Sequence, residues 1–463
     1  EKLNQQKKDT KFQRLALVRG PFPGIGTGDP DLYKAFCWRF FNLTNYDGNV
    51  GVVLPRSVFS SKGSSEFRKH IFTNSSHIYL FNLKNKKNWV FDNVTEQYTV
   101  TLASFHKNSN LPVNNQSEIY VSTICNSYEE LKKIQTKSMI SLSLKEIASM
   151  TEHLTIPLIK SNKSINLLKK MCKQQRIIDH DSDGWCIKAY SELHATNDKK
   201  DNKTGQMLMN FESVEQSDDL WPIYAGKSFN LWEPDLGSKT YYAQGNPDTL
   251  LPFLQKKRLR QIKNKKSAFF NLNLSSGLET LPCCNYRIVF RDIARATDFR
   301  TLITALLPPN RFITNTAPAL HFIEGDSYDI SYVLGILSSI TLDWFAKHFV
   351  ELHVNLFIFN CLPIPRIELE NILRIRVVEL AGRLACVDER YADWAVEIGV
   401  KYGSLPLKEK NDMIHELDAV VAHLYGLSEE QLTHIFETFH VGWDYQDRLD
   451  DTLEHFNEWK QKL

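Results

Sequence analysis

The sequence of 463 residues predicts an α/β protein with a helical C-terminal region. Three observations support this fold class. Between residues 31 and 105, helical and strand-like patterns alternate in the order expected for the second half of a doubly wound sheet. From about residue 110 to 365, short helical and extended segments follow one another without a repeat, as in a mixed α and β domain. After residue 365 the pattern turns strongly helical.

The first predicted elements are a loop and an amphipathic helix. Residues 11–30 should form an irregular loop, because glycine and proline interrupt any periodic pattern there. A helix is predicted over residues 31–42. Its Leu32, Phe36 and Phe40 recur at every fourth position, so they lie on one face of the helix.

Strands dominate the segment that follows. A buried strand is predicted over 50–54, where a proline ends it, then a helix over 64–71 and a second strand over 77–82. Residues 89–92 and 98–105 are expected to pair as an antiparallel hairpin, because apolar and polar residues alternate in the second segment.

The C-terminal region contains two helix boundaries that the sequence places directly. Gly426 is expected to end the helix predicted over 408–425, because glycine accepts the left-handed conformation of a helix C-cap. Ser428 should cap the next helix, with Gln431 as its capping-box partner. The expected domain boundaries are 1–125, 126–365 and 366–463.

Overall composition leaves the binding partner open, whereas one local cluster suggests nucleic acid. The net charge is only +2, and the isoelectric point is about 8.1. Within residues 256–266, however, seven of eleven side chains are basic. Such a run can neutralise several phosphates, although it can equally be the solvated face of a helix. The candidate DNA contacts in this run are Lys256, Lys257, Arg258, Arg260 and Lys263.

Several other classes of protein are disfavoured. The eight cysteines include no Cys-x-x-Cys pair, so reduced thiols of the cytoplasm are favoured over a zinc site or a disulfide framework. Apolar runs are too short for a membrane span, and no glycine-rich phosphate-binding loop occurs. The acidic and histidine side chains Asp181, Asp183, Glu192 and His194 lack convincing metal-nuclease spacing, so no metal is predicted.

The segment from Gly28 to Arg56 resembles the middle of the catalytic domain of DNA methyltransferases that modify N6 of adenine. The likeness lies in Asp31-Leu32-Tyr33-x-x-Phe36, followed by a strand that ends at Pro55. It implies that Phe36, with Asp31, belongs to the site of S-adenosylmethionine, where Phe36 would lie beside the adenine ring. The alternative is that Phe36 is simply part of the core face of its helix.

A second likeness to the same family lies in Trp89-Val90-Phe91-Asp92-Asn93-Val94. It implies that Phe91 packs against an adenine flipped out of the duplex, and that Phe91 and Phe36 line one shared cleft. Flipping is required because N6 is otherwise buried in the base stack. The alternative is that Phe91 covers the sheet as an ordinary hairpin aromatic residue.

The segment from Arg287 to Pro309 is similar to the target-recognition region of Eco57I-like restriction–modification enzymes, including those of type IIG. The helical tail also recurs in that family. The likeness implies that Arg295 and Arg300 reach DNA, since arginine contacts phosphates and guanine edges. Arg291 and Asp292 are expected to form an internal ion pair that shapes a loop, although Arg291 could also contact DNA.

Together these likenesses imply the C-terminal part of an adenine-N6 methyltransferase that acts on double-stranded DNA in the prokaryotic cytoplasm. The fold would be the second half of a Rossmann-like methyltransferase sheet, a target-recognition domain and a helical region. The family's catalytic Asn-Pro-Pro-aromatic tetrapeptide should lie just before this region, and the sequence starts at Glu1 without it. An upstream half or a partner chain is therefore expected to complete the cofactor site.

Three alternatives remain open at this stage. Methyltransferases of BREX-like and DISARM-like phage-defence systems are close siblings. The chain could also be a non-catalytic DNA-binding specificity module that works with a separate catalytic chain. Finally, it could be a degenerate methyltransferase-like protein retained for interaction.

Overall fold

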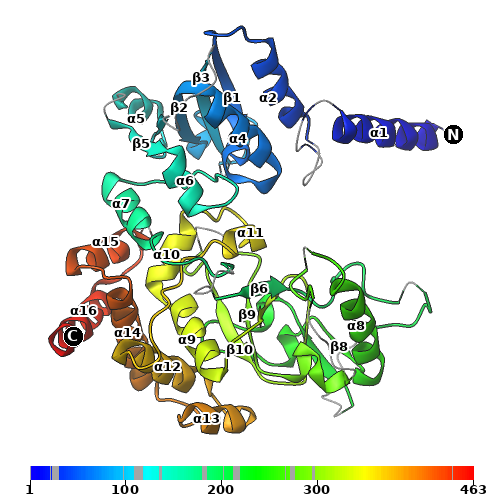
Figure 1. The fold of residues 1–463 in the computed structure, drawn as a ribbon, viewed down its shortest axis with the longest axis vertical. Helices are drawn as coiled ribbons and strands as arrows, with labels where there is room; N and C mark the ends of the chain where they lie inside the picture. The colour runs from blue at the N-terminus through cyan, green and yellow to red at the C-terminus, as the bar shows by residue number, and fades with distance from the viewer. Residues whose placement is uncertain are drawn as a thin grey trace. The chain divides into compact units, whose positions relative to one another are not determined.

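The computed structural model describes residues 2–463 except 21, 23–24, 26–30, 97, 109–117, 135–137, 180–184, 202, 212–218, 266, 272–276, 295–297 and 441. The chain is a mixed α/β protein with several sheets and a helical C-terminal region (Figure 1). It divides into two compact units, Glu1–Cys172 and Lys173–Leu463.

The first unit is built on a five-stranded sheet with the order β1-β3-β2-β4-β5. Strand β3 lies antiparallel between β1 and β2, so β1 and β2 run in the same direction. Strand β4 continues the sheet parallel to β2, and β5 pairs antiparallel with β4. The strands are β1 (Asn49–Pro55), β2 (Ser75–Lys84), β3 (Thr99–Lys107), β4 (Glu118–Val121) and β5 (Ile140–Ser143).

Helices connect these strands as the sequence predicts. The chain leaves β1, forms α3 and α4 and returns in β2, because parallel strands need a long crossover rather than a tight turn. Helix α4 anchors this crossover by burying Phe67, Ile71 and Phe72. The helices after the first are α2 (Leu32–Leu43), α3 (Ser57–Ser60), α4 (Ser65–Asn74), α5 (Tyr128–Lys133), α6 (Leu144–Met150) and α7 (Asn162–Met171).

Two local predictions in the first unit are wrong. Residues 11–19 belong to helix α1 (Lys2–Arg19) instead of a loop, because the first helix breaker is Gly20. None of the residues of α1 is buried. Residues 89–92 form no strand; β3 pairs directly with β2, and residues 85–96 and 98 belong to the connection between them.

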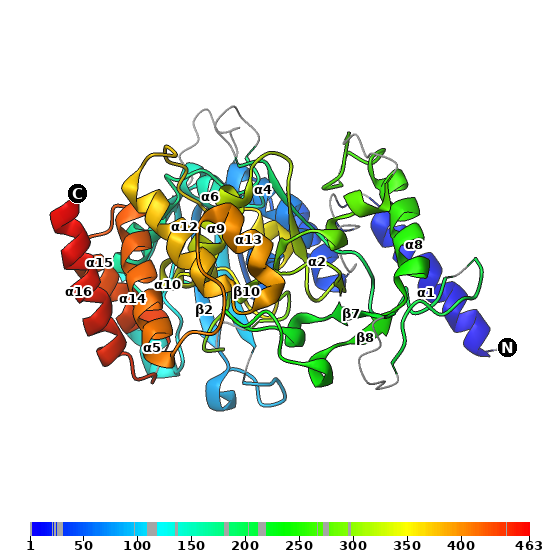
Figure 2. The ribbon, with the colours of Figure 1, turned by 90° about the horizontal axis from the view of Figure 1, so that it is seen from below.

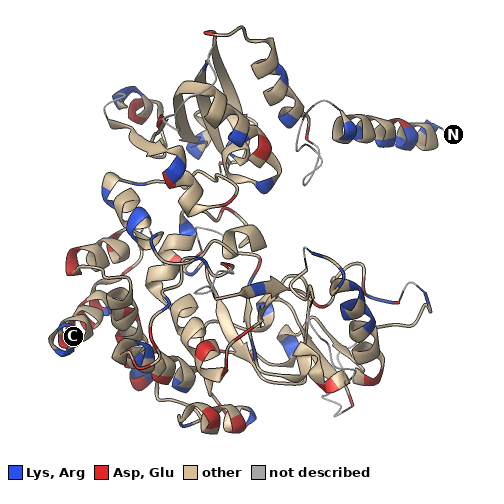
Figure 3. Cartoon of the chain, viewed as in Figure 1, with Lys and Arg blue, Asp and Glu red and all other residues tan. Residues whose placement is uncertain are grey.

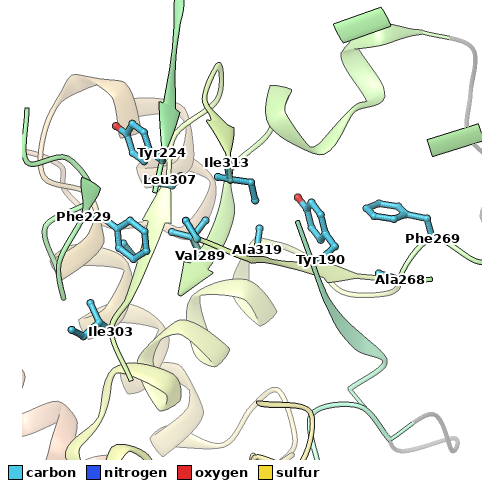
Figure 4. Packing of buried hydrophobic residues seen from close by; sticks show 12 residues of the cluster. Tyr190, Tyr224, Phe229, Ala268, Phe269, Val289, Ile303, Leu307, Ile313 and Ala319 are labelled. Atoms are coloured by element: carbon cyan, nitrogen blue, oxygen red, sulfur yellow. The ribbon is translucent and has the colours of Figure 1, made fainter. Parts of the chain in front are cut away.

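The second unit contains two sheets that share a core. One has the order β10-β9-β12-β6 and the other β11-β7-β8. Figure 4 shows the shared cluster. It combines Tyr190 and Val289, from the four-stranded sheet, with Tyr224 and Ile313, from the three-stranded sheet. The strands are β6 (Ile187–Tyr190), β7 (Trp221–Tyr224), β8 (Ala243–Gly245), β9 (Arg287–Phe290), β10 (Thr304–Leu307), β11 (Phe312–Ile313) and β12 (Ala319–Phe322).

From Ser327 onward the second unit is largely helical, as Figure 2 also shows. The sequence predicts a strongly helical pattern after residue 365, which the helices from α12 onward confirm. None of the helices in the described residues is long and apolar enough to cross a membrane. They are α8 (Pro247–Gln261), α9 (Ser327–Ser338), α10 (Ile340–Lys347), α11 (Leu356–Phe359), α12 (Ile372–Ala385), α13 (Ala392–Ile398), α14 (Leu407–Leu424), α15 (Glu429–Phe439) and α16 (Gln446–Lys462).

The boundary between α14 and α15 confirms both predicted caps. Gly426 adopts a φ of +62°, which lies in the left-handed region that favours glycine. The Ser428 hydroxyl accepts from the main-chain N–H of Gln431 at 3.3 Å, and the Gln431 side chain accepts from the Ser428 N–H at 3.1 Å. Helix α14 therefore ends, and helix α15 begins, where the sequence predicts.

The compact units divide the chain differently from the three domains expected at 1–125, 126–365 and 366–463. The first unit extends to Cys172, because β5 lies after residue 126 and still pairs with β4 of the first sheet. Residues 366–463 belong to the same compact unit as the two smaller sheets.

Close packing of α9 on α12 leads to a stability prediction. A Cβ on Gly335 would lie 2.6 Å from Val377 Cγ1 and 3.1 Å from Ala381 Cβ. We expect Gly335→Ala to lower the free energy of unfolding by about 1–2 kcal/mol, because overpacking outweighs the gain in helix propensity. Denaturant titration of the full chain, followed by circular dichroism, measures this change.

The matched control is Gly51→Ala, since a Cβ there meets no atom within 4 Å. This variant should be at least as stable as the parent chain. Equal stability of the two variants would contradict the close packing at Gly335.

Candidate functional site

The carboxyl ends of β1 and β2 lie at the same edge of the first sheet. Pro55, the last residue of β1, pairs with Val100, and Lys84, the last residue of β2, pairs with the adjacent Thr99. In open α/β sheets, ligands bind outside the carboxyl ends of the strands. A binding site in the first unit is therefore expected at this edge.

Two segments that carry sequence-predicted site residues begin at this edge. The connection over residues 85–96 and 98, here called the Phe91 loop, leaves directly from the end of β2. The N-terminal turn of α2 also lies there, because the Tyr33 hydroxyl is 3.2 Å from the hydroxyl of Ser57, which follows β1.

The Phe91 loop is organised by one buried amide side chain. Asn85 is fully buried. Its Oδ1 accepts from the main-chain N–H groups of Val90 and Phe91, both at 3.0 Å. Its Nδ2 donates to the carbonyls of Phe91 at 2.9 Å and Val94 at 2.6 Å. Since four main-chain groups depend on one side chain, Asn85 fixes the path of the loop.

This arrangement presents the ring of Phe91 to solvent. The main chain of Phe91 is held at both its N–H and its carbonyl, while its side chain is 42% exposed. The ring is therefore not buried as an ordinary cover for the sheet. Asn85 is a residue that sequence reasoning missed, because nothing in the local pattern distinguishes it from other loop asparagines.

Helix α2 presents its predicted apolar face outward. Leu32, Phe36, Phe40 and Leu43, here called the α2 stripe, are between 36% and 65% exposed. The core instead receives Cys37, Trp38 and Phe41. The alternative that Phe36 is a core residue is thus wrong. Its ring stacks on Phe40 with 5.9 Å between centroids.

Asp31 and Phe36 lie one turn apart on this helix. Asp31 occupies the N-cap position of α2 with an exposed carboxylate that makes no capping hydrogen bond. Within the described residues, no contact joins the rings of Phe36 and Phe91. The shared cleft expected for the two rings stays a prediction.

Strand β1 forms one edge of the sheet and pairs only with β3 among the described residues. Val53 on this strand is 50% exposed, and the space around Gly51 is open. An edge of this kind leaves N–H and C=O groups available to a further strand.

In the second unit, the predicted basic run falls at the end of α8 and just beyond it (Figure 3). Lys256, Arg260 and Lys263 are exposed. Lys257 is half-buried, and its Nζ donates to the Glu192 carbonyl at 2.6 Å and to Asp198 Oδ2 at 3.0 Å. These cations remain candidates for DNA contact.

Arg258 is a correction to the predicted DNA contacts, because it is buried. Its guanidinium lies 3.8 Å from the ring centroid of Phe269 and 4.8 Å from that of Tyr190. It donates to the Gln261 side chain at 2.6 Å. Burial lowers the pKa of this guanidinium. Arg258 therefore holds α8 on the core and cannot reach DNA in this structure.

Arg300 is a second correction. It is 6% exposed and pairs with Asp343, which is fully buried. It also donates to the carbonyl of Ser338 at 2.6 Å. Asp343 in turn accepts from the main-chain N–H of Leu302 at 2.9 Å. The pair fixes the loop before β10. Arg295 lies outside the described residues.

The expected ion pair between Arg291 and Asp292 is wrong. Arg291 donates to the carbonyl of Phe229. Asp292 Oδ2 lies 3.0 Å from His353 Nδ1. Arg291 and Asp292 directly follow β9. Adjacent residues in an extended chain point to opposite sides, so the two side chains contact different partners.

The acidic and histidine cluster considered for metal chemistry does not assemble in the described residues, where no group of three metal-ligating side chains occurs. Glu192 is buried and pairs with Arg287 at 2.9 Å. His194 is exposed and accepts from the nearby main-chain N–H groups of Thr196 and Asn197. Asp181 and Asp183 lie outside the described residues.

Comparisons with known proteins find similarity among solved structures. The sequence matches no protein-family model and no curated protein. The type IIL restriction–modification enzyme MmeI in complex with DNA is similar at 14% identity and a TM-score of 0.44; the match covers 95% of this chain and 55% of that one.

Two further structures are similar at lower scores. The type IIG restriction endonuclease BpuSI matches at 13% identity and a TM-score of 0.30, over 89% of this chain and 51% of that one. The DrdV–DNA complex matches at 10% identity and a TM-score of 0.34, over 80% and 41%. The chain thus spans about half the length of these structures or less.

The hub role of Asn85 leads to a testable prediction. Asn85→Ala removes four hydrogen bonds to the main chain, each worth about 0.5–1.5 kcal/mol. We expect amide hydrogen exchange at Val90 and Phe91 to accelerate at least roughly tenfold, since each 1.4 kcal/mol is a factor of ten. Hydrogen exchange read by mass spectrometry on a peptide that covers the Phe91 loop measures this.

Asn93→Ala is the matched control, because Asn93 is an exposed asparagine of the same loop. It should leave exchange unchanged. Unchanged exchange in Asn85→Ala would mean that the loop is held by something else.

The corrected role of Arg300 makes a stability prediction. Arg300→Ala leaves the buried Asp343 carboxylate without its guanidinium partner, so the free energy of unfolding should fall by about 3–5 kcal/mol. Arg260→Ala, at an exposed position, should change it by less than about 0.5 kcal/mol. Chemical denaturation monitored by circular dichroism compares them. An unchanged free energy of unfolding in Arg300→Ala would contradict a structural role for Arg300.

Proposed function

We propose that this chain is one part of a site-specific DNA methyltransferase that modifies N6 of adenine in a restriction–modification or related phage-defence system. In this proposal it contributes the pocket for the flipped base and the recognition of DNA sequence. The observation that carries the proposal is the Phe91 loop, because a buried amide holds an exposed aromatic ring at the carboxyl edge of the five-stranded sheet.

The position of Phe91 suits contact with an extruded base. A base that leaves the duplex loses its stacking neighbours, which costs a few kcal/mol. An aromatic face replaces part of this stacking and is worth about 1–3 kcal/mol per base. Because the loop backbone is fixed, the ring loses little freedom when it binds. Phe91 would therefore act by packing and would not move a proton.

The residues of α2 fit part of a site for S-adenosylmethionine, which supplies an electrophilic methyl group when bound. The exposed ring of Phe36 offers a stacking face for a purine. The exposed carboxylate of Asp31 offers an acceptor for hydroxyl or ammonium donors one turn away. No other donor-binding group of the family is present in the sequence, so the remainder of this site would come from another segment.

The open edge at β1 supports the same conclusion about a missing part. A doubly wound sheet buries both faces and continues on both sides of its centre. Here β1 ends the sheet with Val53 exposed, and the α2 stripe is uncovered in the described residues. We propose that the half with the donor-binding and Asn-Pro-Pro-aromatic motifs, upstream in the same protein or on a partner chain, packs against this edge.

A non-catalytic specificity module is the second candidate. The exposed cations of α8 favour it, because they provide for DNA binding without any contribution from the first unit. In that case the exposed rings of Phe36 and Phe91 would have no role in methyl transfer.

Reconstitution tests the proposal. The chain is combined with the polypeptide encoded immediately upstream, and transfer of labelled methyl groups to double-stranded DNA is measured. Phe91→Ala should lower kcat/KM by roughly 5- to 150-fold, which corresponds to the loss of about 1–3 kcal/mol of stacking. Phe91→Trp should retain most of the activity, because it keeps an aromatic face.

Tyr98→Ala serves as the control, since Tyr98 is an exposed aromatic residue of the same loop. It should change kcat/KM less than twofold. Tight binding of DNA together with equal methylation by Phe91→Ala and the parent chain would instead favour the specificity module.

A further inference from the structure

A groove in the second unit is lined by cations from two separate elements. Its volume is about 230 Å³. One wall is the exposed side of α8, and the other is a turn formed by residues 198–201 and 203–207, here called the Lys200 turn. The lining residues are Phe253, Lys256, Lys257 and Arg260 from α8, and Asp198, Lys200, Asp201 and Lys203 from the Lys200 turn.

The groove carries an excess of positive charge. Asp198 is engaged by Lys257 at 3.0 Å. Asp201 Oδ1 accepts from the main-chain N–H of Lys203 at 2.8 Å. The remaining cations, Lys200, Lys203, Lys256 and Arg260, form no ion pair within the part of the chain that the structure describes. Such a surface attracts anions and leaves its ammonium and guanidinium groups free to bind them.

The Lys200 turn is held in place beside α8. Asp201 and Gln206 form a main-chain hydrogen bond of 2.9 Å across the turn, and the N–H of Gly205 donates to the Asp201 carbonyl at 2.8 Å. The Gln206 side chain donates to Thr249 on α8 at 3.3 Å. The ion pair of Lys257 with Asp198 fastens the start of the turn. The cations on the two walls are thus partly preorganised, which lowers the entropy cost of binding.

We propose that this groove binds the phosphodiester backbone of DNA, with Lys200 and Lys203 contacting phosphate opposite Lys256 and Arg260. The inference rests on the proposed function, since it assumes that the chain binds duplex DNA. Lysine presents a compact charge on a flexible stem, so it suits phosphate better than the fixed pattern of a base edge. The groove therefore contributes affinity and register, and sequence is read elsewhere. Lys257 is a positioning residue that holds the turn.

The test uses the full chain, labelled duplexes of two unrelated sequences and fluorescence anisotropy over a series of salt concentrations. The variants are Lys200→Gln/Lys203→Gln and Lys256→Gln/Arg260→Gln. Removal of one cation that binds a phosphate should reduce the slope of log K against log salt by about 0.9, and a double variant should reduce it by up to about 1.8. Both duplexes should be affected equally.

Lys133→Gln/Lys145→Gln is the charge-matched control, because both lysines are exposed in the first unit. It should leave the slope unchanged, and Lys200→Arg/Lys203→Arg should preserve it. Circular dichroism verifies that every variant is folded.

The outcomes separate this inference from the proposed function. Normal binding by the parent chain with unchanged slopes in both groove variants would overturn the groove alone. A loss confined to one duplex sequence would overturn the assignment to the backbone. Binding of millimolar inorganic phosphate to the parent chain, measured by isothermal titration calorimetry, without any binding of duplex would identify a site for free phosphate instead. Failure of the parent chain to bind any duplex would overturn both proposals.

Discussion

The insertion of β3 between β1 and β2 is the constraint on which the first unit depends. Because β3 runs against both neighbours, β1 and β2 are parallel and end at the same edge. A parallel pair also needs a helical crossover, which α3 and α4 provide. The Phe91 loop must then lie at this edge, since it joins the end of β2 to the start of β3. Position at the edge thus follows from strand order, while the conformation of the loop follows from Asn85.

Desolvation decides which arginines serve the fold and which remain available to partners. Arg258 and Arg300 sit in sequence contexts that look as suitable for DNA as that of Arg260. Yet each is buried against aromatic rings or a carboxylate, where a guanidinium is costly unless it is paired or stacked. The polar partners come from residues far along the chain, such as Asp343, so no local pattern reveals them.

Sequence was most informative where local chemistry alone sets the structure. Gly426 and Ser428 end and begin helices because of their own conformational and hydrogen-bonding preferences, and strands around Leu54 and Leu80 follow from apolar runs. It was least informative where tertiary contacts decide. The four-residue repeat of Leu32, Phe36 and Phe40 correctly predicts a helix, but periodicity cannot say whether an apolar face meets the core or solvent. The roles of Phe36 and Phe91 in binding stay predictions.

The exposed edge of the sheet at Gly51 and Val53 affects how the protein behaves during purification. Among the described residues this apolar edge of β1 has no pairing strand, which makes it a template for intermolecular pairing, and neither lysine nor a bulge protects the centre of β1. Preparations of the chain by itself should consequently self-associate as concentration rises. If the proposed upstream half covers this edge, production of the two together should keep the chain monodisperse, so purification behaviour becomes an early test of that proposal.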